Sequence, residues 1–189
     1  MKYLYRLPFL ILVLMSLIAF GQKSSIDPKN STVHWLGEKV TGQHDGYISI
    51  KKGVIELKKN RIIAGEFTID MNSITCTDIE DDTYNKKFVG HLKNDDFFGV
   101  NDFPEASFKL TSSSKFNKGV ASLTGKITIK GKTEEISFKV FKSKNTYTAK
   151  IKIDRTKFGI KYGSASFFES LGDRAIYDEF TLDVKLVVK

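Results

Sequence analysis

Nearly every segment after residue 30 alternates apolar and polar side chains, which is the pattern of a half-buried β-strand. In the segment 62–73, for example, Phe67, Ile69 and Met71 share one face. The alternation predicts about eight strands, which lie at or around 32–40, 47–50 with 53–57 (two short strands or one bent strand), 62–73, 106–110, 123–129, 136–140, 147–153 and 176–188. Strands at this spacing, joined by short turns, indicate an all-β sandwich or barrel with one apolar interior.

Glycine, asparagine, serine and lysine clusters predict the turns between these strands. The turns are expected at 42–46, 58–61, 112–119, 130–132 and 144–145, and Gly125 is expected at a bulge or sharp bend. Two features stay unassigned: the role of His44 and Asp45, and the strand pairing of the long connection 154–170.

The stretch 88–104 is the one segment after residue 30 that does not look like a strand. Tyr84, Phe88 and Leu92 follow one another at a spacing of four, which predicts a short helix. The acidic run before it suits the positive end of the helix dipole. A loop is expected from Asp95 to Pro104. A lone helix and loop in an all-β chain predict a lid over the barrel opening.

The first 21 residues have the composition of a secretory signal peptide. Lys2 and Arg6 precede an apolar run over 7–20, which is too short to span a bilayer comfortably. The small residues Ala19 and Gly21 predict cleavage before Gln22, although an uncleaved N-terminal anchor is the alternative. We therefore divide the chain into a signal peptide, 1–21, and one domain, 22–189. Export would place the domain in the periplasm or outside the cell of a bacterium.

The chain carries a formal net charge of +8, which falls to +6 once Lys2 and Arg6 are removed. The lysines are spread along the strands, and together with export this argues against nucleic acid as a partner. Such lysines usually form a solvated outer face and protect strand edges, and attraction to anionic lipid head groups is a second interpretation. The oligomeric state stays open, with a dimer as one option.

No group of residues in the sequence predicts catalysis or a metal site. Cys76 is the only cysteine and has no base placed beside it by the sequence, so it is expected to be a small, partly buried residue. The three histidines lack the paired spacing of metal ligands. His91 is expected to fix a loop by hydrogen bonding. Asp154 and Arg155 are expected to form an ion pair, and Asp95 and Asp96 to serve in a turn or cap.

Five stretches of the chain resemble, in order, the YceI-like family of exported, lipocalin-like proteins. They are Ile26-Asp27-Pro28 with Ser31 and Val33, Gly65–Ile69 with Ser73-Ile74, His91–Phe98 with Phe103-Pro104 and Phe108, Leu123–Gly125 with Gly131–Thr133, and Ile153–Arg155 with Phe158–Ile160. The resemblance implies an eight-stranded antiparallel barrel with one short helix near its mouth. It also implies an apolar tunnel that holds a polyisoprenoid lipid or a quinone tail, with no other cofactor and no catalytic motif.

The aromatic and aliphatic residues of the strands and of the lid are the candidates for contact with such a lipid, although a packed core is the plainer interpretation of the strand residues. The candidate ligand-binding residues are Trp35, Phe67, Ile69, Phe88, Leu92, Phe97, Phe98, Phe108, Phe158 and Phe168. The expected function is an exported, non-catalytic protein that carries or stores a long apolar lipid. The alternative is an envelope stress-protection or interaction module, which has a side-chain-filled core and acts through its basic surface.

Overall fold

The computed structural model of the protein describes residues 21–189, so the predicted signal peptide, apart from Gly21, lies outside the described residues. The described chain forms one antiparallel sheet of nine strands. The strands are β1 (Gln22–Ser25), β2 (Thr32–Lys39), β3 (Gly42–Lys58), β4 (Arg61–Asp70), β5 (Glu105–Ser113), β6 (Val120–Ile129), β7 (Lys132–Ser143), β8 (Thr146–Asp154) and β9 (Ile176–Val187).

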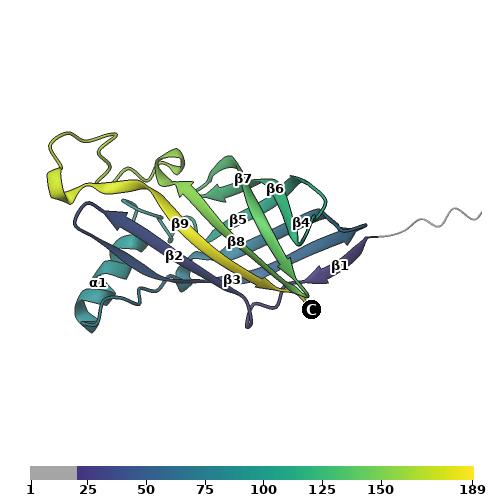
Figure 1. Cartoon of the computed structure of the whole chain (residues 1–189). Coiled ribbons are helices and arrows are strands. Elements are labelled where there is room, and N and C mark those ends of the chain that lie inside the picture. Colours follow the sequence, from purple (N-terminus) through teal and green to yellow (C-terminus); the bar gives the residue numbers. More distant parts are fainter. Residues whose placement is uncertain (1–20) are drawn as a thin grey trace, which may run out of the picture.

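Eight of these strands close into a barrel, which confirms the predicted fold class. The order runs β3-β2-β9-β8-β7-β6-β5-β4, and β4 pairs back with β3 to close the sheet. Closure leaves each barrel strand with a neighbour on both sides and one face turned inward. Figure 1 shows the long strands β3 and β9 running most of the length of this elongated barrel.

The ninth strand, β1, was not predicted by the alternation. It pairs with Val54 to Leu57 in the second half of β3. The first half of β3 pairs with β2 along the same edge. Its polar sequence, from Gln22 to Ser25, buries only one side chain, so it carries no period-two pattern. Its contribution comes from main-chain pairing and from the buried residue that follows it, Ile26.

The hairpin turns match the sequence predictions except at one place. Lys59-Asn60 and Lys130-Gly131 connect their strands with two residues of positive φ, the conformation that tight hairpins prefer. The turn predicted at 42–46 was wrong, because β3 already begins at Gly42. Gly46 lies inside the strand, where an added Cβ would come within 2.0 Å of the main-chain oxygen of Thr75.

The segment between β4 and β5 leaves the sheet and returns to it across one end of the barrel. It contains a 3-10 turn, Met71–Ser73, and the predicted helix, α1 (Asp82–Lys93). Asp81 caps α1 by accepting a hydrogen bond from the Tyr84 main-chain nitrogen at 2.7 Å, and Asn94 ends it. The connection from β8 to β9, which the sequence left open, contains 3-10 turns at Arg155–Phe158 and Gly172–Arg174.

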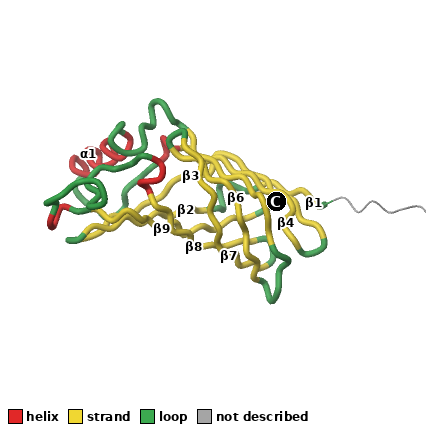
Figure 2. The backbone as a smooth tube through the Cα atoms, turned by 90° about the horizontal axis from the view of Figure 1, so that it is seen from above, coloured by secondary structure: helices red, strands yellow, loops and turns green. Residues whose placement is uncertain are grey.

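The barrel therefore has two distinct ends. Helix α1 and the long β8–β9 connection lie at one end, which we call the helix end (Figures 1 and 2). The strand β1 and the C-terminus lie at the other, the terminal end, where Ile26 bridges to Val188. One buried apolar cluster lies toward each end, including Phe116 and Tyr147 at the terminal end and Val100 and Ile160 at the helix end. Within residues 21–189, no helix has the length and apolar character needed to cross a bilayer.

Candidate functional site: an apolar cavity in the barrel

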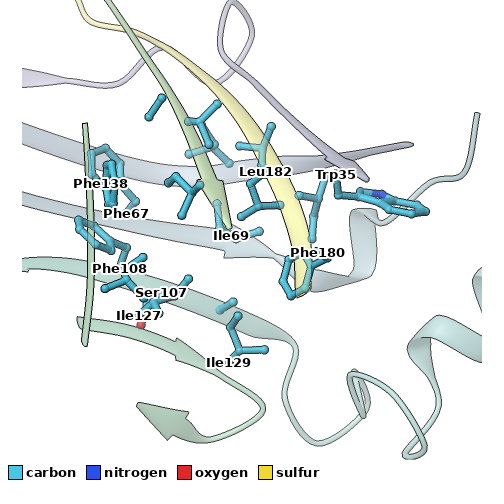
Figure 3. Close-up of a pocket in the computed structure, with 18 of the residues that line it drawn as sticks. Trp35, Phe67, Ile69, Ser107, Phe108, Ile127, Ile129, Phe138, Phe180 and Leu182 are labelled. Carbon is cyan, nitrogen blue, oxygen red and sulfur yellow. The ribbon is translucent and has the colours of Figure 1, made fainter. Parts of the chain in front are cut away.

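The interior of the barrel holds a cavity of about 240 Å³ between the two buried clusters. Its lining consists almost entirely of inward-facing apolar side chains from all eight barrel strands and from the lid. Volumes of small-molecule sites commonly start at about 300 Å³, so a ligand larger than this space needs lining side chains to move. Figure 3 shows the arrangement of part of this lining.

Three phenylalanines from adjacent or facing positions form the aromatic wall of the cavity. Phe67 lies opposite Phe108 in the β4–β5 register, with ring centroids 6.1 Å apart, and Phe138 of β7 lies 5.6 Å from Phe108 (Figure 3). Gly125 on β6 makes room for this group, because an added Cβ would meet the Phe108 ring at 2.3 Å. The bulge predicted near Gly125 lies opposite it, between Leu110 and Ser112 of β5.

The lid contributes lining from one turn of α1 and from the loop after it. Leu92 of α1 and Phe97 and Phe98 of the loop all line the cavity. Phe97 is buried against His91 and Tyr162, with ring centroids 5.1 Å and 5.5 Å away. The lid is thus held to the β8–β9 connection by aromatic packing.

At the helix end, the lining extends to the last residues of β2 and the first of β9. Glu38, Tyr177 and Glu179 belong to the lining there and are exposed to solvent. Trp35 lies on β2 opposite Leu182 of β9, and its indole nitrogen donates a hydrogen bond to the main-chain oxygen of Thr75 at 3.0 Å. We call this region the mouth of the cavity.

One buried charge, Arg155, lies beside the mouth, and each of its three side-chain nitrogens already donates a hydrogen bond. Its guanidinium donates to the main-chain oxygens of Ile160, Ile176 and Tyr177 at 2.9–3.0 Å. Its carboxylate partner is Asp178, at 3.7 Å. The predicted pair of Asp154 with Arg155 was therefore wrong.

The Asp154 carboxylate instead accepts hydrogen bonds from the Thr156 main chain and hydroxyl and so caps the turn that contains Arg155. Burial lowers the pKa of Arg155, and the nearby Asp178 carboxylate opposes that shift. Arginine remains charged even so. Because each guanidinium nitrogen already donates to a main-chain oxygen, Arg155 has a structural role in joining the β8–β9 connection to β9.

Seven of the ten candidate residues line the cavity, which are Trp35, Phe67, Ile69, Leu92, Phe97, Phe98 and Phe108. The other three lie elsewhere. Phe88 packs its ring against His44, with centroids 4.5 Å apart. Phe158 is only 2% exposed and packs into the helix-end cluster. Phe168 is half exposed on the β8–β9 connection. Contact of any of these residues with a ligand stays a prediction.

Several lining residues were not among the candidates. Phe138, Ile127 and Leu182 belong to the wall, together with Arg155 at the mouth. The alternation of their strands is the signal that could have found the first three, because it places every second residue inside. No local sequence pattern predicts that Arg155 lines the cavity, because its position depends on main-chain oxygens of the β8–β9 connection and of β9.

The three histidines have separate environments. His34 contacts the Asp45 carboxylate and His44 the Asp78 carboxylate, each at 2.8 Å. His91 lies between the rings of Phe97 and Tyr162, and its Nε2 has no hydrogen-bond partner among the described residues. The prediction that His91 fixes a loop by hydrogen bonding is therefore not met by Nε2, and aromatic packing holds the ring instead.

Cys76 is buried, as expected, and its thiol donates a hydrogen bond to Asp78 at 3.1 Å. Burial, together with this hydrogen bond, raises the pKa of the Cys76 thiol to about 11. A thiol with so high a pKa is a poor nucleophile. The Asp78 carboxylate is in turn the partner of His44, because one of its oxygens contacts the thiol and the other lies 2.8 Å from His44 Nδ1.

The family model of the YceI-like domain matches residues 25–188. The chain belongs to the YceI-like family. Solved structures with the same fold include Burkholderia cenocepacia BcnA, which is 22% identical with a TM-score of 0.67 over 87% of this chain and 99% of that chain. No curated protein matches this YceI-like chain.

Two further YceI-like folds are similar over most of the barrel. A polyisoprenoid-binding domain from Saccharophagus degradans, implicated in plant cell wall breakdown, is 15% identical with a TM-score of 0.57 over 88% of this chain and 97% of that chain. A mutant Campylobacter jejuni YceI protein is 21% identical with a TM-score of 0.54 over 72% of this chain and 80% of that chain. At these identities the similarity establishes the fold.

Proposed function

We propose that this YceI-like protein is an exported, non-catalytic carrier that holds a long apolar lipid of the polyisoprenoid or quinone type inside its barrel. The observation that carries the proposal is the apolar cavity enclosed by the closed sheet. A cavity inside the barrel also favours a ligand-holding interior over the alternative of a core filled entirely by side chains. The Saccharophagus degradans relative, described as a polyisoprenoid-binding domain, supports the same ligand class.

The chemistry of the lining selects for a hydrocarbon chain. Each methylene moved from water into such a lining contributes about 0.8 kcal/mol, so a long chain binds without a charged anchor. A charged or strongly polar group deep inside would lose its hydration without compensation, because the lining there consists of apolar side chains. We therefore expect the chain to occupy the interior and the head group to remain at the mouth.

The first test is to purify the protein from its native host without detergent, extract it with organic solvent and identify the extract by mass spectrometry. A prenyl lipid in a stoichiometric amount is the expected result. The second test titrates lipid-free protein with a prenyl quinone and follows the fluorescence of Trp35, the only tryptophan of the chain and a lining residue. Saturable quenching at one equivalent is expected.

An empty extract from a protein that also shows no quenching with added prenyl quinone would overturn the carrier proposal. It would favour an interaction module acting through the basic surface, for which salt-sensitive binding to anionic vesicles is the characteristic result. Extraction of lipid from vesicles that does not depend on salt would instead support the carrier.

A further inference from the structure

We propose that His44, Cys76 and Asp78 form a binding site for a zinc-like divalent metal ion, where β3, the segment 74–81 and α1 meet at the helix end of the barrel. One donor atom from each of the three residues lies within 4.8 Å of the other two. This site is separate from the cavity and does not depend on the proposed lipid ligand.

The three donors are of the types that zinc prefers. Thiolate sulfur, imidazole nitrogen and carboxylate oxygen all occur in zinc sites, whereas calcium and magnesium take oxygen ligands only. Bonds of about 2.3 Å to sulfur and about 2.0–2.1 Å to nitrogen or oxygen place donors about 3.3–3.7 Å apart around a tetrahedral ion. The present donors lie within 4.8 Å of one another, so small side-chain movements would bring them to that separation, and water would complete the coordination.

The main chain that carries two of the ligands is fixed against β3. The Thr75 nitrogen donates to the Tyr47 oxygen at 3.0 Å, and the Thr77 nitrogen donates to the Asp45 oxygen at 2.9 Å. This pairing extends the edge of β3 beyond its last partner in β4, Asp70 opposite Ser49. Cys76 and Asp78 are thereby placed beside His44, which lies 34 positions from Asp78 in the sequence.

Helix α1 contacts two of the three residues, Cys76 and His44. The Asn85 side chain donates to the main-chain oxygens of Cys76 and Ile79 at 3.0 Å and 2.9 Å. Phe88 packs against the His44 ring. Such contacts behind the ligands are what orient a metal site and raise its affinity. A bound ion would therefore tie the lid helix to the barrel wall.

An ion can reach the site from solvent. The side chains of His44 and Asp78 are 27% and 30% exposed, while Cys76 lies beneath them. Binding converts the Cys76 thiol to a thiolate and releases its proton to solvent. The thiolate and the Asp78 carboxylate then balance the two positive charges of the ion.

The chain offers a matched control in the pair His34 and Asp45. This pair has the same 2.8 Å contact and similar exposure, but Thr77, and not a cysteine, is its third partner. If the site requires the thiol, replacing His44 should weaken metal binding and replacing His34 should not. Random binding of metal to exposed histidine and aspartate would make the two replacements equivalent.

The test is titration of the purified protein with Zn²⁺ against a chromophoric chelator, and with Co²⁺ followed by absorbance. We expect one equivalent of either ion and a near-ultraviolet thiolate-to-cobalt charge-transfer band. The variants Cys76→Ser, His44→Gln and Asp78→Asn should each weaken Zn²⁺ binding at least about tenfold, and Cys76→Ser should abolish the band. His34→Gln should bind as the wild type does.

The proposal is overturned by binding below one equivalent, by unchanged affinity in Cys76→Ser, or by an equal loss in His34→Gln. If a variant fails to fold, as judged by circular dichroism without metal, the wild type alone still decides the matter. Since Cys76 is the only cysteine, Zn²⁺ should slow its modification by a thiol reagent. If Zn²⁺ gives no protection and Co²⁺ gives no charge-transfer band, the three residues form only a hydrogen-bonded cluster.

Discussion

Arg155 and Asp178 show how single residues hold the mouth of the barrel in place. The guanidinium joins the turn after β8 to the start of β9 through three main-chain oxygens. Its charge is nearly fully buried, and Asp178 is its only carboxylate partner within 4.0 Å in the described chain. A buried charge is costly unless it is satisfied in this way, and so is the loss of one partner of a satisfied group.

Replacing Arg155 with methionine should therefore destabilise the protein by about 3–5 kcal/mol. The change leaves three main-chain oxygens without their donor and Asp178 without its counter-charge. Urea unfolding, followed by circular dichroism, measures the effect. The exposed neighbour Lys157 is the control, because Lys157→Met should change the stability by no more than about 0.5 kcal/mol. Equal effects of the two changes would contradict a structural role for the buried guanidinium.

Asp178 makes the stability of the fold depend on pH in the acid range. Burial raises the pKa of Asp178, but the hydroxyl groups of Ser164 and Ser166 and the charge of Arg155 outweigh burial, so the pKa lies below the ordinary value of 3.8. A carboxyl with a lowered pKa in the folded state stabilises the fold above its unfolded pKa and loses this contribution as the pH falls through the folded one.

We expect the free energy of unfolding to decline below about pH 4 in the wild type, and to decline less steeply in Asp178→Asn. The measurement is urea unfolding at a series of pH values. The variant should be the less stable protein at neutral pH, since it lacks the charge that faces Arg155. If the free energy of unfolding falls with pH equally steeply in the two proteins, Asp178 does not contribute to the loss of stability in acid.

At the scale of elements, Gly46 lets the segment 75–77 pair along β3. Any Cβ at this position would overlap the Thr75 main-chain oxygen, which lies 2.0 Å away from it. Gly46→Ala should therefore displace the segment and cost at least about 1–3 kcal/mol. Gly90 on α1 is the contrasting case, because a Cβ there meets nothing within 4 Å. Gly90→Ala should stabilise the protein by about 0.5–1 kcal/mol.

Thermal or urea unfolding of the two glycine variants tests this prediction directly. The same alanine substitution is expected to act in opposite directions, so a general effect of glycine replacement cannot explain the result. The close-approach explanation fails if Gly46→Ala is as stable as the wild type.

Gly46 also illustrates which elements could be predicted from the sequence. Alternation found the barrel strands because each has one face in the core, and it found α1 from three residues at helical spacing. Glycines at 42 and 46 suggested a turn, but here glycine serves a close approach between two main chains. β1 was missed because a strand that contributes mainly main-chain hydrogen bonds has no required side-chain pattern.

The residues of the candidate site likewise fall into those that the sequence could place and those that it could not. A strand residue such as Phe67 or Phe108 points inward because of its place in a period of two, so its cavity position could be predicted. Phe88 and Phe168 lie on a helix and an irregular connection, where sequence alone does not determine which direction a side chain takes. The cluster of His44, Cys76 and Asp78 depends on a segment returning to β3, and nothing in the spacing of these residues indicates it.

At the scale of the whole molecule, the cavity should limit the length of chain that the barrel accepts. Ala149 is a small lining residue on β8, two positions from Tyr147 of the terminal-end cluster. Ala149→Phe should fill the deeper part of the cavity. We expect long prenyl quinones to bind at least about tenfold more weakly, a loss of about 1.4 kcal/mol, while short ones retain most of their affinity.

Trp35 quenching with prenyl quinones of graded length measures this effect. Lys150→Phe is the matched control, because it adds the same ring to the exposed face of β8. It should leave the affinity unchanged at every length. A uniform loss of affinity for short and long chains in Ala149→Phe would contradict binding along the length of the barrel.

The first strand of the described chain and the C-terminus meet at the terminal end, so the two ends of the barrel differ. Ile26 bridges to Val188, and the Lys189 nitrogen donates to the Ser25 oxygen at 2.9 Å. The last residues of β2 and the first of β9, which border the mouth, lie at the opposite end, as does α1 (Figure 1). A solid support attached at the C-terminus would therefore lie at the end of the barrel away from the mouth and leave the mouth accessible to the solution.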